Sequence, residues 1–145
     1  MRQMTDQENC LRPLFRKLIE VPIAPRWRDL DALNHVNNAN FLTYVEEARL
    51  HWFATLDGPW SAQGYMPVLA AVHCNYRAQL SWPGGLIVEL YCERVGNSSV
   101  TIAHRIVDAA RREKIYCDGN NVLVWVDPAT GTPVALPDVI RRACG

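Results

Sequence analysis

One short stretch of the chain gathers most of the side chains that could do chemistry. Residues 26–41 read RWRDLDALNHVNNANF and hold two aspartates, one histidine and four asparagines between a tryptophan and a phenylalanine. A carboxylate can attack a carbonyl carbon, or it can activate a water molecule that does so. The stretch is therefore either a catalytic site or a polar turn, and the elements around it must decide between the two.

A helical pattern begins where this stretch ends. Apolar residues recur at three- and four-residue intervals from Asn38 to Leu56. The apolar stripe covers more than half of the circumference, which predicts one long helix nearly enclosed by other elements. Asn37 or Asn38 is a suitable N-cap, because an asparagine oxygen accepts a hydrogen bond from a free N–H of the first turn. The loop that follows carries Trp60, Tyr65 and Met66, and we expect it to line the substrate pocket or a dimer seam rather than to project into solvent.

Period-two alternation replaces the helical pattern after Pro67. Four segments rich in β-branched and aromatic residues are separated by short turns; they are residues 68–80, 86–95, 99–109 and 114–127. Short turns join antiparallel hairpins. An earlier segment, residues 19–27, carries two prolines, which confine a strand to a sheet edge. This order predicts an α+β fold in which a curved sheet wraps around the long helix, with a short helical turn in the tail.

The two faces of the predicted strands suggest different environments. Ile87, Tyr91 and Val107 lie on the face away from the helix, where a monomer would leave them exposed, so we expect an oligomer. His104 lies on an apolar face and is interpreted as a satisfied core or interface histidine.

Length and composition exclude several classes of protein. The chain has 145 residues, and we expect a loose segment over residues 1–18 followed by a single domain over residues 19–145. Lys and Arg number 15, as do Asp and Glu, so no global field would recruit nucleic acid. We find neither a secretory signal nor an apolar run near the roughly 20 residues of a membrane span, and we expect a cytoplasmic protein. Five cysteines without a C-x-x-C pair indicate reduced thiols rather than a zinc knuckle.

The predicted layout places residues 28–40 in the loop that enters the long helix. A helix N-terminus presents unpaired N–H groups and a partial positive charge of about half a unit, which can hold the oxygen of a polarised carbonyl. Together with a carboxylate a few residues earlier, this arrangement suits acyl transfer to water. His35 could orient water or a carbonyl, or brace the loop, and Asp29 could bond loop N–H groups or pair with Arg26 or Arg28. No nucleophile elbow, metal cluster or Gly-rich phosphate loop competes in the sequence, so we expect neither metal nor cofactor.

Residues 26–49, RWRDLDALNHVNNANFLTYVEEAR, resemble the signature of the hotdog-fold acyl-CoA thioesterases of the 4-hydroxybenzoyl-CoA thioesterase type. In that pattern D-x-D precedes H-V-N-N, and E-E-A-R follows on the central helix. The similarity covers roughly residues 20–135, through NYRAQLSWPG and RVGNSSVTIAHRI. The resemblance implies a long helix wrapped by a five-stranded antiparallel sheet, assembly as a homodimer or homotetramer, and hydrolysis of an acyl-CoA.

The resemblance also implies roles for individual residues. Asp31 matches the catalytic aspartate, as nucleophile or general base, and Asn38 matches the position whose backbone N–H polarises the thioester carbonyl. His35, Asn37 and Asn40 match motif residues that shape the site.

The substrate's other parts have weaker candidates. Phe41 could belong to a bulky acyl lining, and Ser98 and Ser99 could contact the pantetheine arm. The candidate cations for the coenzyme's phosphates are Arg77, Arg94, Arg111, Arg112 and Lys114.

Three departures and two rivals bear on this interpretation. Asn34 stands where many members have glycine. Leu33 replaces the asparagine that plant acyl-carrier-protein thioesterases use, and Val36 occupies the position of the hydratase histidine. The substrate could instead be carried on acyl carrier protein, or the chain could be a non-catalytic acyl-binding protein. The retained Asp31 argues against the second rival, because a pure binder has no use for a carboxylate beside a carbonyl.

Overall fold

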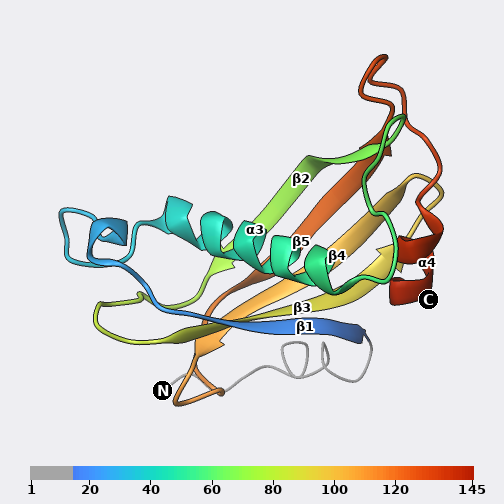
Figure 1. Cartoon of the computed structure of the whole chain (residues 1–145). Helices are drawn as coiled ribbons and strands as arrows, with labels where there is room; N and C mark the ends of the chain where they lie inside the picture. Colours follow the sequence, from blue (N-terminus) through green and yellow to red (C-terminus); the bar gives the residue numbers. More distant parts are fainter. Residues whose placement is uncertain (1–14) are drawn as a thin grey trace.

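The computed structural model describes residues 15–145, which form a strand, a long helix, four further strands and a short closing helix (Figure 1). The elements are β1 (Arg16–Ile23), a 3-10 turn η1 (Trp27–Asp29), α3 (Asn38–Thr55), β2 (Met66–Tyr76), β3 (Leu86–Val95), β4 (Ser99–Asp108), β5 (Ile115–Val126) and α4 (Asp138–Cys144). The predicted order is confirmed, and so are the long helix and the helical turn in the tail.

The strands form one antiparallel sheet in the order β1-β3-β4-β5-β2. The short turns pair β3 with β4 and β4 with β5, as predicted. The predicted hairpin of β2 with β3 is wrong, because β2 crosses over to the sheet edge and pairs with β5. Helix α3 lies across one face of this curved sheet (Figure 1). The expected α+β hotdog architecture, a helix wrapped by five antiparallel strands, is therefore confirmed.

The start of the domain differs from the prediction. Strand β1 begins at Arg16, and Arg16 and Lys17 already pair with Cys92 and Tyr91 of β3. The predicted boundary at residue 19 thus falls inside a strand, while residues 1–14 of the predicted loose segment lie outside the described residues. The two prolines predicted a strand at the edge of the sheet, and this prediction is confirmed, because β1 is an edge strand.

The core lies between α3 and the inner face of the sheet. The helix buries one face of seven residues, namely Phe41, Tyr44, Val45, Ala48, Arg49, Trp52 and Phe53. Alternate residues of β3 and β4 meet this face, among them Val88, Leu90, Ile102 and Ile106. The periods of 3.6 and 2 in the sequence therefore mark the two sides of one core. None of the helices in residues 15–145 is long and apolar enough to cross a membrane.

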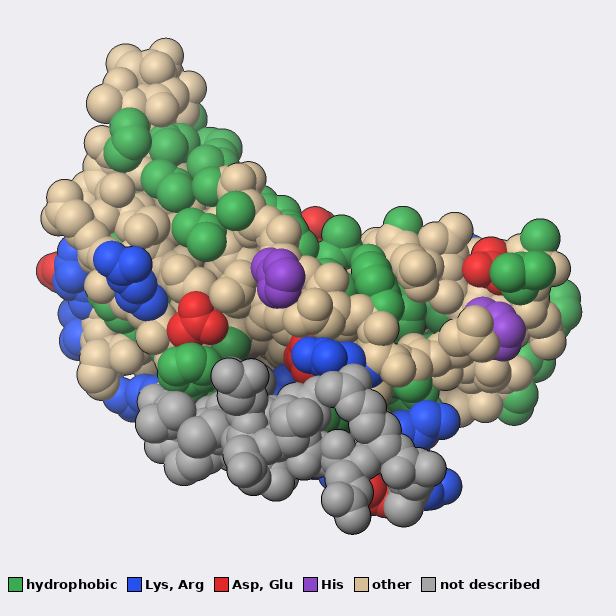
Figure 2. Space-filling model, turned by 180° about the vertical axis from the view of Figure 1, so that it is seen from behind, with side chains coloured by type: hydrophobic (Ala, Val, Ile, Leu, Met, Phe, Trp, Pro, Cys, Tyr) green, Lys and Arg blue, Asp and Glu red, His purple; other side chains and the backbone are tan. Residues whose placement is uncertain are grey.

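The outer face of the sheet is less exposed than predicted. Tyr91 is 2% exposed and Val107 is 0% exposed, so a single chain does not leave them in water. Exposed apolar side chains instead follow the edge strand β2; they are Met66, Leu69, Val72 and Tyr76. Figure 2, the view from behind, shows hydrophobic side chains gathered where β2 begins and β5 ends. The exposed apolar surface of the described chain that a second copy could cover therefore lies along the β2 edge rather than on the outer face of the sheet.

Candidate active site

The loop between β1 and α3 folds back on itself through a short backbone ladder. Asn37 N–H donates to the Asp29 carbonyl at 2.9 Å, and Asp31 N–H donates to the His35 carbonyl at 2.8 Å. An isolated bridge joins Leu30 and Val36 between these two rungs. The ladder holds residues 29–37 in a defined shape immediately before the helix.

Asn34 makes the turn at the tip of this ladder. Its φ is 62°, in the left-handed region that favours glycine but that asparagine also adopts. Its N–H donates to the Asp31 carbonyl at 3.1 Å. Asparagine therefore does here what the glycine of many family members would do, and this departure leaves the loop shape intact.

Asp31 presents an exposed carboxylate that the loop orients from one side. Its Oδ1 accepts hydrogen bonds from the N–H groups of Leu33, at 2.8 Å, and His35, at 3.3 Å. Among residues 15–145 no partner is found for Oδ2. One oxygen is thus used for positioning, and the other is available to a substrate or to water.

Asp29, the other carboxylate of the D-x-D pair, holds the loop through one carboxylate oxygen and its carbonyl. Its Oδ2 accepts from Arg26 N–H at 2.9 Å and from the Tyr44 hydroxyl at 2.7 Å. Its carbonyl accepts from Asn37 N–H and from Asn40 Nδ2, both at 2.9 Å. Burial, followed by the bond to Asp29, raises the pKa of Tyr44 well above its usual range, so this phenol stays a donor. Asp29 is a brace.

The start of α3 lies next to this brace. Asn37 is the N-cap, and its Oδ1 accepts from Ala39 N–H at 3.0 Å. The N–H of Asn38 has no acceptor within the described part of the chain, and its carbonyl accepts from the Tyr76 hydroxyl at 3.2 Å. The Asp31 carboxylate and the first N–H groups of α3 are therefore carried by one short, hydrogen-bonded segment of the chain.

Three other predicted residues lie around the same helix start. His35 is half-buried, and its buried Nδ1 has no hydrogen-bond partner within residues 15–145. Asn40 braces the loop through the Asp29 carbonyl. Phe41 is 1% exposed and packs edge-on against the rings of Tyr44 and Tyr76, so it belongs to the core below the site.

The remaining predicted residues differ in position. Arg77 follows Tyr76, whose hydroxyl bonds the start of α3, whereas Ser98 and Ser99 lie elsewhere in the sheet. Arg77 forms a salt bridge with Asp118, with an Nη2–Oδ1 distance of 3.1 Å. Ser98 and Ser99 lie at the β3–β4 turn, where Arg141 of α4 donates to the Asn97 carbonyl at 2.8 Å. Figure 1 shows this turn at the α4 end of the sheet, opposite to the loop before α3.

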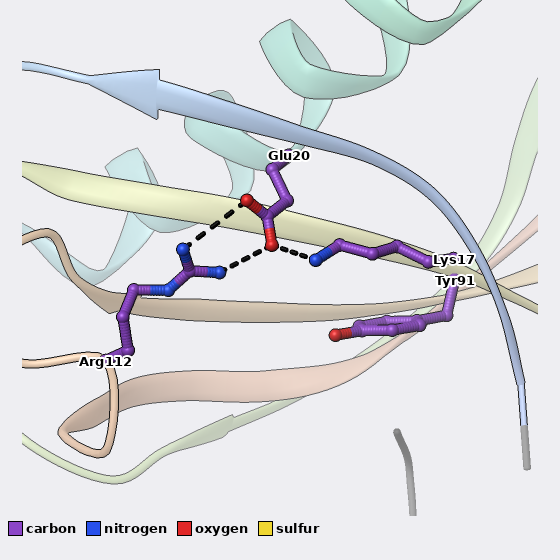
Figure 3. A pocket seen from close by; sticks show the side chains of 4 residues that line it. All are labelled: Lys17, Glu20, Tyr91 and Arg112. Atoms are coloured by element: carbon purple, nitrogen blue, oxygen red, sulfur yellow. Dashed lines mark hydrogen bonds and ion pairs between the residues drawn. The ribbon is translucent and has the colours of Figure 1, made fainter. Parts of the chain in front are cut away.

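Two hollows open on the described surface. One is a groove of about 410 Å³ between α3 and β2; it is lined by Glu46, Arg49, Leu50, Phe53, Trp60, Ser61, Met66, Pro67, Leu69 and Leu123. In the sequence, this groove was indicated by the apolar side chains of the loop after the helix, of which Trp60 and Met66 line it. The other hollow lies beside β1 and β3, where the Glu20 carboxylate bonds both Lys17 and Arg112 (Figure 3). The charged groups in this hollow form ion pairs with one another, so none of them is a candidate reacting group.

One set of side chains in the described residues is close enough to share a metal ion. The donor atoms of Cys74, His104 and Cys117 all lie within 4.8 Å of one another. They belong to β2, β4 and β5, outside the loop that carries Asp31.

Comparison with known proteins identifies relatives of the whole domain. Residues 25–144 match the family model described as the thioesterase-like superfamily. A solved structure of a candidate acyl-CoA thioesterase from Xanthomonas campestris is 47% identical, covers 78% of this chain and 96% of its own, and superposes with a TM-score of 0.73. A candidate thioesterase from Pseudomonas aeruginosa is 34% identical, covers 90% of this chain and 100% of its own, and has a TM-score of 0.81. The uncharacterised protein YsmA of Bacillus subtilis (strain 168) is 28% identical over 80% of this chain and 78% of its own.

Proposed function

Because the chain belongs to the thioesterase-like superfamily and is a thioester hydrolase, we propose that it hydrolyses an acyl-CoA to the free acid and CoA. The observation that carries this proposal is the Asp31 carboxylate, which is oriented through Oδ1 and open at Oδ2 beside the start of α3. The 47% identical relative named as a candidate acyl-CoA thioesterase supports coenzyme A as the carrier of the acyl group.

The proposed reaction uses the Asp31 carboxylate and the N–H group of Asn38 at the start of α3. The Asn38 N–H donates to the thioester oxygen and stabilises the negative charge that develops there, helped by the partial positive charge of the helix end. Asp31 attacks the thioester carbon through Oδ2, or it removes a proton from a water molecule that attacks. The carbon–sulfur bond then breaks, and CoA leaves as its thiolate. If Asp31 is the nucleophile, the acyl group remains on Asp31 as an anhydride, which a water molecule hydrolyses to the free acid. If Asp31 is the general base, the attacking water forms the free acid directly, so that this water must have space before the carbon–sulfur bond breaks.

Other residues have supporting roles in this proposal. His35 Nδ1 is a buried polar atom without a partner in residues 15–145, and it can bond the water or the substrate carbonyl. Asn37 and Asn40 hold the loop against the helix, and Phe41 forms the floor beneath.

The coenzyme contacts require more than the single chain. Arg77 is paired with Asp118, so a phosphate would have to compete with a carboxylate for it. Ser98 and Ser99 lie at the far end of the sheet, and we assign them to the pantetheine arm only where a second copy brings its turn to the loop.

We propose that this second copy pairs along strand β2. An edge strand presents unpaired backbone N–H and C=O groups, and here it also carries apolar side chains that are more than one-third exposed, such as Leu69 at 47% and Val72 at 39%. Such pairing would give a homodimer, and two dimers could form a homotetramer. We also propose a cytoplasmic location, which agrees with an acyl-CoA substrate and with free cysteines at positions 74, 92, 117 and 144.

A thiol-release assay with a panel of acyl-CoAs tests the proposal. Release of CoA that depends on Asp31 is the expected result. Faster thiol release when the same acyl groups are carried on acyl carrier protein would show that the substrate is an acyl-acyl carrier protein, with the same hydrolytic chemistry. Tight binding of acyl-CoA without any thiol release would show that the chain is an acyl-binding protein.

A further inference from the structure

Three neighbouring strands bring a cysteine and a histidine together over a glycine. Cys74 of β2 is opposite Gly119 of β5, and Gly119 is opposite His104 of β4. Because Gly119 has no side chain, the groups on the two outer strands can approach each other above it. Cys117, two residues earlier on β5, has the same side-chain direction as Gly119 and adds a second thiol to this place.

The glycine also brings the two strands themselves close. A Cβ atom on Gly119 would lie 1.9 Å from the carbonyl oxygen of His73, a distance that no side chain allows. The absence of this atom lets β2 approach β5 at Cys74. The two cysteines are diagonal rather than opposite in register, since Cys117 is paired with Tyr76, so the close approach is what lets their sulfurs meet.

The sulfur atoms of Cys74 and Cys117 are 2.7 Å apart. His104 Nε2 lies 3.8 Å from the Cys117 sulfur, and His104 Nδ1 lies 3.1 Å from Asn121 Nδ2. The imidazole is therefore held from one side by a buried amide and faces the thiols with the other.

The two thiols differ in the way that a redox pair requires. Cys74 is partly exposed on the edge strand, whereas Cys117 is 0% exposed. The hydrogen bond from Cys117, aided by His104, lowers the pKa of Cys74 to about 5, although burial opposes it. The bond to Cys74, together with burial, raises the pKa of Cys117. The accessible sulfur of Cys74 is thus the nucleophile, and the buried sulfur of Cys117 is placed to act as the resolving thiol.

A shared zinc ion is the alternative use of these groups. Two thiolates bound to one tetrahedral zinc, each at about 2.3 Å, would be roughly 3.8 Å apart. The sulfurs are more than 1 Å closer than that, and the set supplies three donors where a closed site needs four. The geometry therefore favours direct chemistry between the two sulfurs.

We propose that Cys74 and Cys117 form a peroxide-reactive dithiol site, in which Cys74 is oxidised first and Cys117 resolves it to a disulfide. This proposal does not rest on the thioesterase assignment. It does depend on the assembly, because a second copy paired along β2 would cover Cys74. The dithiol therefore reacts in chains whose β2 edge is free, and peroxide is added at a protein concentration at which light scattering shows the monomer. A reversible pair of this kind is compatible with a reducing cytosol, where disulfides are transient.

The proposed reaction consumes one hydrogen peroxide. The Cys74 thiolate attacks one peroxide oxygen, so that a sulfur–oxygen bond forms, the oxygen–oxygen bond breaks and hydroxide leaves. The Cys117 sulfur then attacks the Cys74 sulfenic acid, a sulfur–sulfur bond forms, and the sulfenic oxygen leaves as water. In total, two thiols and one hydrogen peroxide give one disulfide and two water molecules, and a dithiol reductant restores the thiols.

Trypsin can separate the relevant cysteines for peptide mapping. Cleavage after arginine and lysine places Cys74 in residues 50–77, Cys117 in residues 115–141, Cys92 in residues 78–94 and Cys144 in residues 143–145. The folded, full-length protein is treated with stoichiometric hydrogen peroxide, alkylated, digested and analysed by mass spectrometry. We expect peptide 50–77 linked to peptide 115–141, and recovery of both as free thiols after dithiothreitol.

Cys92 and Cys144 are the matched control inside the same molecule. Both are less than 10% exposed, and their side chains are hydrogen-bonded to each other, so they are also neighbours. We expect them to oxidise at least tenfold more slowly than Cys74, because neither is accessible.

Two variants separate the roles of the pair. Cys117→Ala removes the resolving thiol and also the hydrogen bond that lowers the pKa of Cys74, so Cys74 should react more slowly at pH 7 than in the wild type. The sulfenic acid that does form cannot be resolved and should accumulate, trapped by dimedone, on peptide 50–77. Cys74→Ser should leave Cys117 unreactive. Oxidation of Cys92 and Cys144 at the same rate as Cys74 would overturn the proposal. So would one tightly bound zinc per chain in the purified protein that keeps both thiols from peroxide.

Discussion

The Tyr44 hydroxyl donates a 2.7 Å hydrogen bond to Asp29 Oδ2 and so ties the second turn of α3 to the loop before it. Asp31, two residues further, makes no such contact with the helix, and its Oδ2 is open within the described residues. The two aspartates of one D-x-D pair are thereby separated into a brace and a candidate reacting group. This division gives the most direct test of the proposed mechanism.

Replacing Asp31 with asparagine should abolish most of the activity. The amide keeps the size and can still accept bonds from Leu33 and His35, but it can neither attack nor accept a proton. A positioned general base contributes about 10²–10⁴ in rate, or roughly 3–5 kcal/mol of barrier, so kcat should fall by that order. KM should change little, because the loop and helix end remain. Steady-state kinetics with an acyl-CoA measures both values.

Asp29→Asn is the control for this substitution. It weakens the bonds from Arg26 and Tyr44, so the melting temperature should fall while kcat changes only modestly. A large loss of kcat in this variant, with near wild-type turnover in Asp31→Asn, would exchange the roles of the two carboxylates.

The cap at the start of α3 should affect both stability and activity. Asn37→Ala removes the acceptor for Ala39 N–H, which typically costs about 1 kcal/mol of unfolding free energy. It also loosens the turn that presents Asn38 N–H, so kcat should fall as well. Asn37→Asp, which retains a capping oxygen, should restore stability in a urea titration. If the alanine variant unfolds at the wild-type urea concentration, the cap is not supporting the helix.

Trp60 should influence substrate choice or assembly. Its ring stacks on Phe53 with centroids 4.4 Å apart, and its carbonyl accepts from Trp125 Nε1 at 2.8 Å. Because Trp60 also lines the groove between α3 and β2, Trp60→Ala should alter the relative kcat/KM for short and long acyl chains, or weaken self-association. The acyl-CoA panel and sedimentation equilibrium measure these effects. If Trp60→Ala changes neither the acyl-chain preference nor the self-association, the loop lines neither the acyl pocket nor the dimer seam.

A charge on the β2 edge should dissociate the proposed oligomer. Leu69 is 47% exposed in the single chain, and burying a lysine at an interface without a partner is costly. Leu69→Lys should therefore shift the mass in light scattering from dimer or tetramer towards monomer. His51→Lys, at an exposed site on α3 that does not line the groove between α3 and β2, controls for added charge away from the strand edge. A stable, active wild-type monomer at micromolar concentration would contradict the assembly.

The reactivity of Cys74 should vary with pH in a way that distinguishes it from an ordinary thiol. Cys117, His104 and Tyr76 surround its sulfur, and the bond from Cys117 is the main reason that its pKa lies at about 5. Its thiolate fraction, and so its alkylation rate, should rise through pH 5 and become constant by pH 7. A thiol of ordinary pKa, about 8.5, would still gain almost tenfold per pH unit in that range. Iodoacetamide labelling of peptide 50–77 between pH 4 and 8 measures the profile.

The sequence by itself determined the elements and the position of the candidate site. Alternating and helical periods depend on which side of each element is buried, so they predicted the long helix from Asn38 and the hairpins of β3, β4 and β5. The motif around Asp31 is local as well, and its turn, its cap and its helix start all lie within residues 29–40. Such features depend on neighbours a few residues away, and these can be recognised in a linear chain.

Only the tertiary structure decided how distant residues meet. The diagonal contact of Cys74 and Cys117, 43 residues apart, depends on the β2–β5 register and on the missing side chain of Gly119. The salt bridge between Arg77 and Asp118 depends on the same register. It gives a carboxylate partner to an arginine that the sequence had suggested as a contact for the coenzyme's phosphates. Strand register and the crossover of β2 to the sheet edge are set by packing over the whole core, because a strand with apolar residues on both faces can pair in several ways. That is why the reactive loop could be predicted from the sequence, whereas the thiol pair and the exposed edge could not.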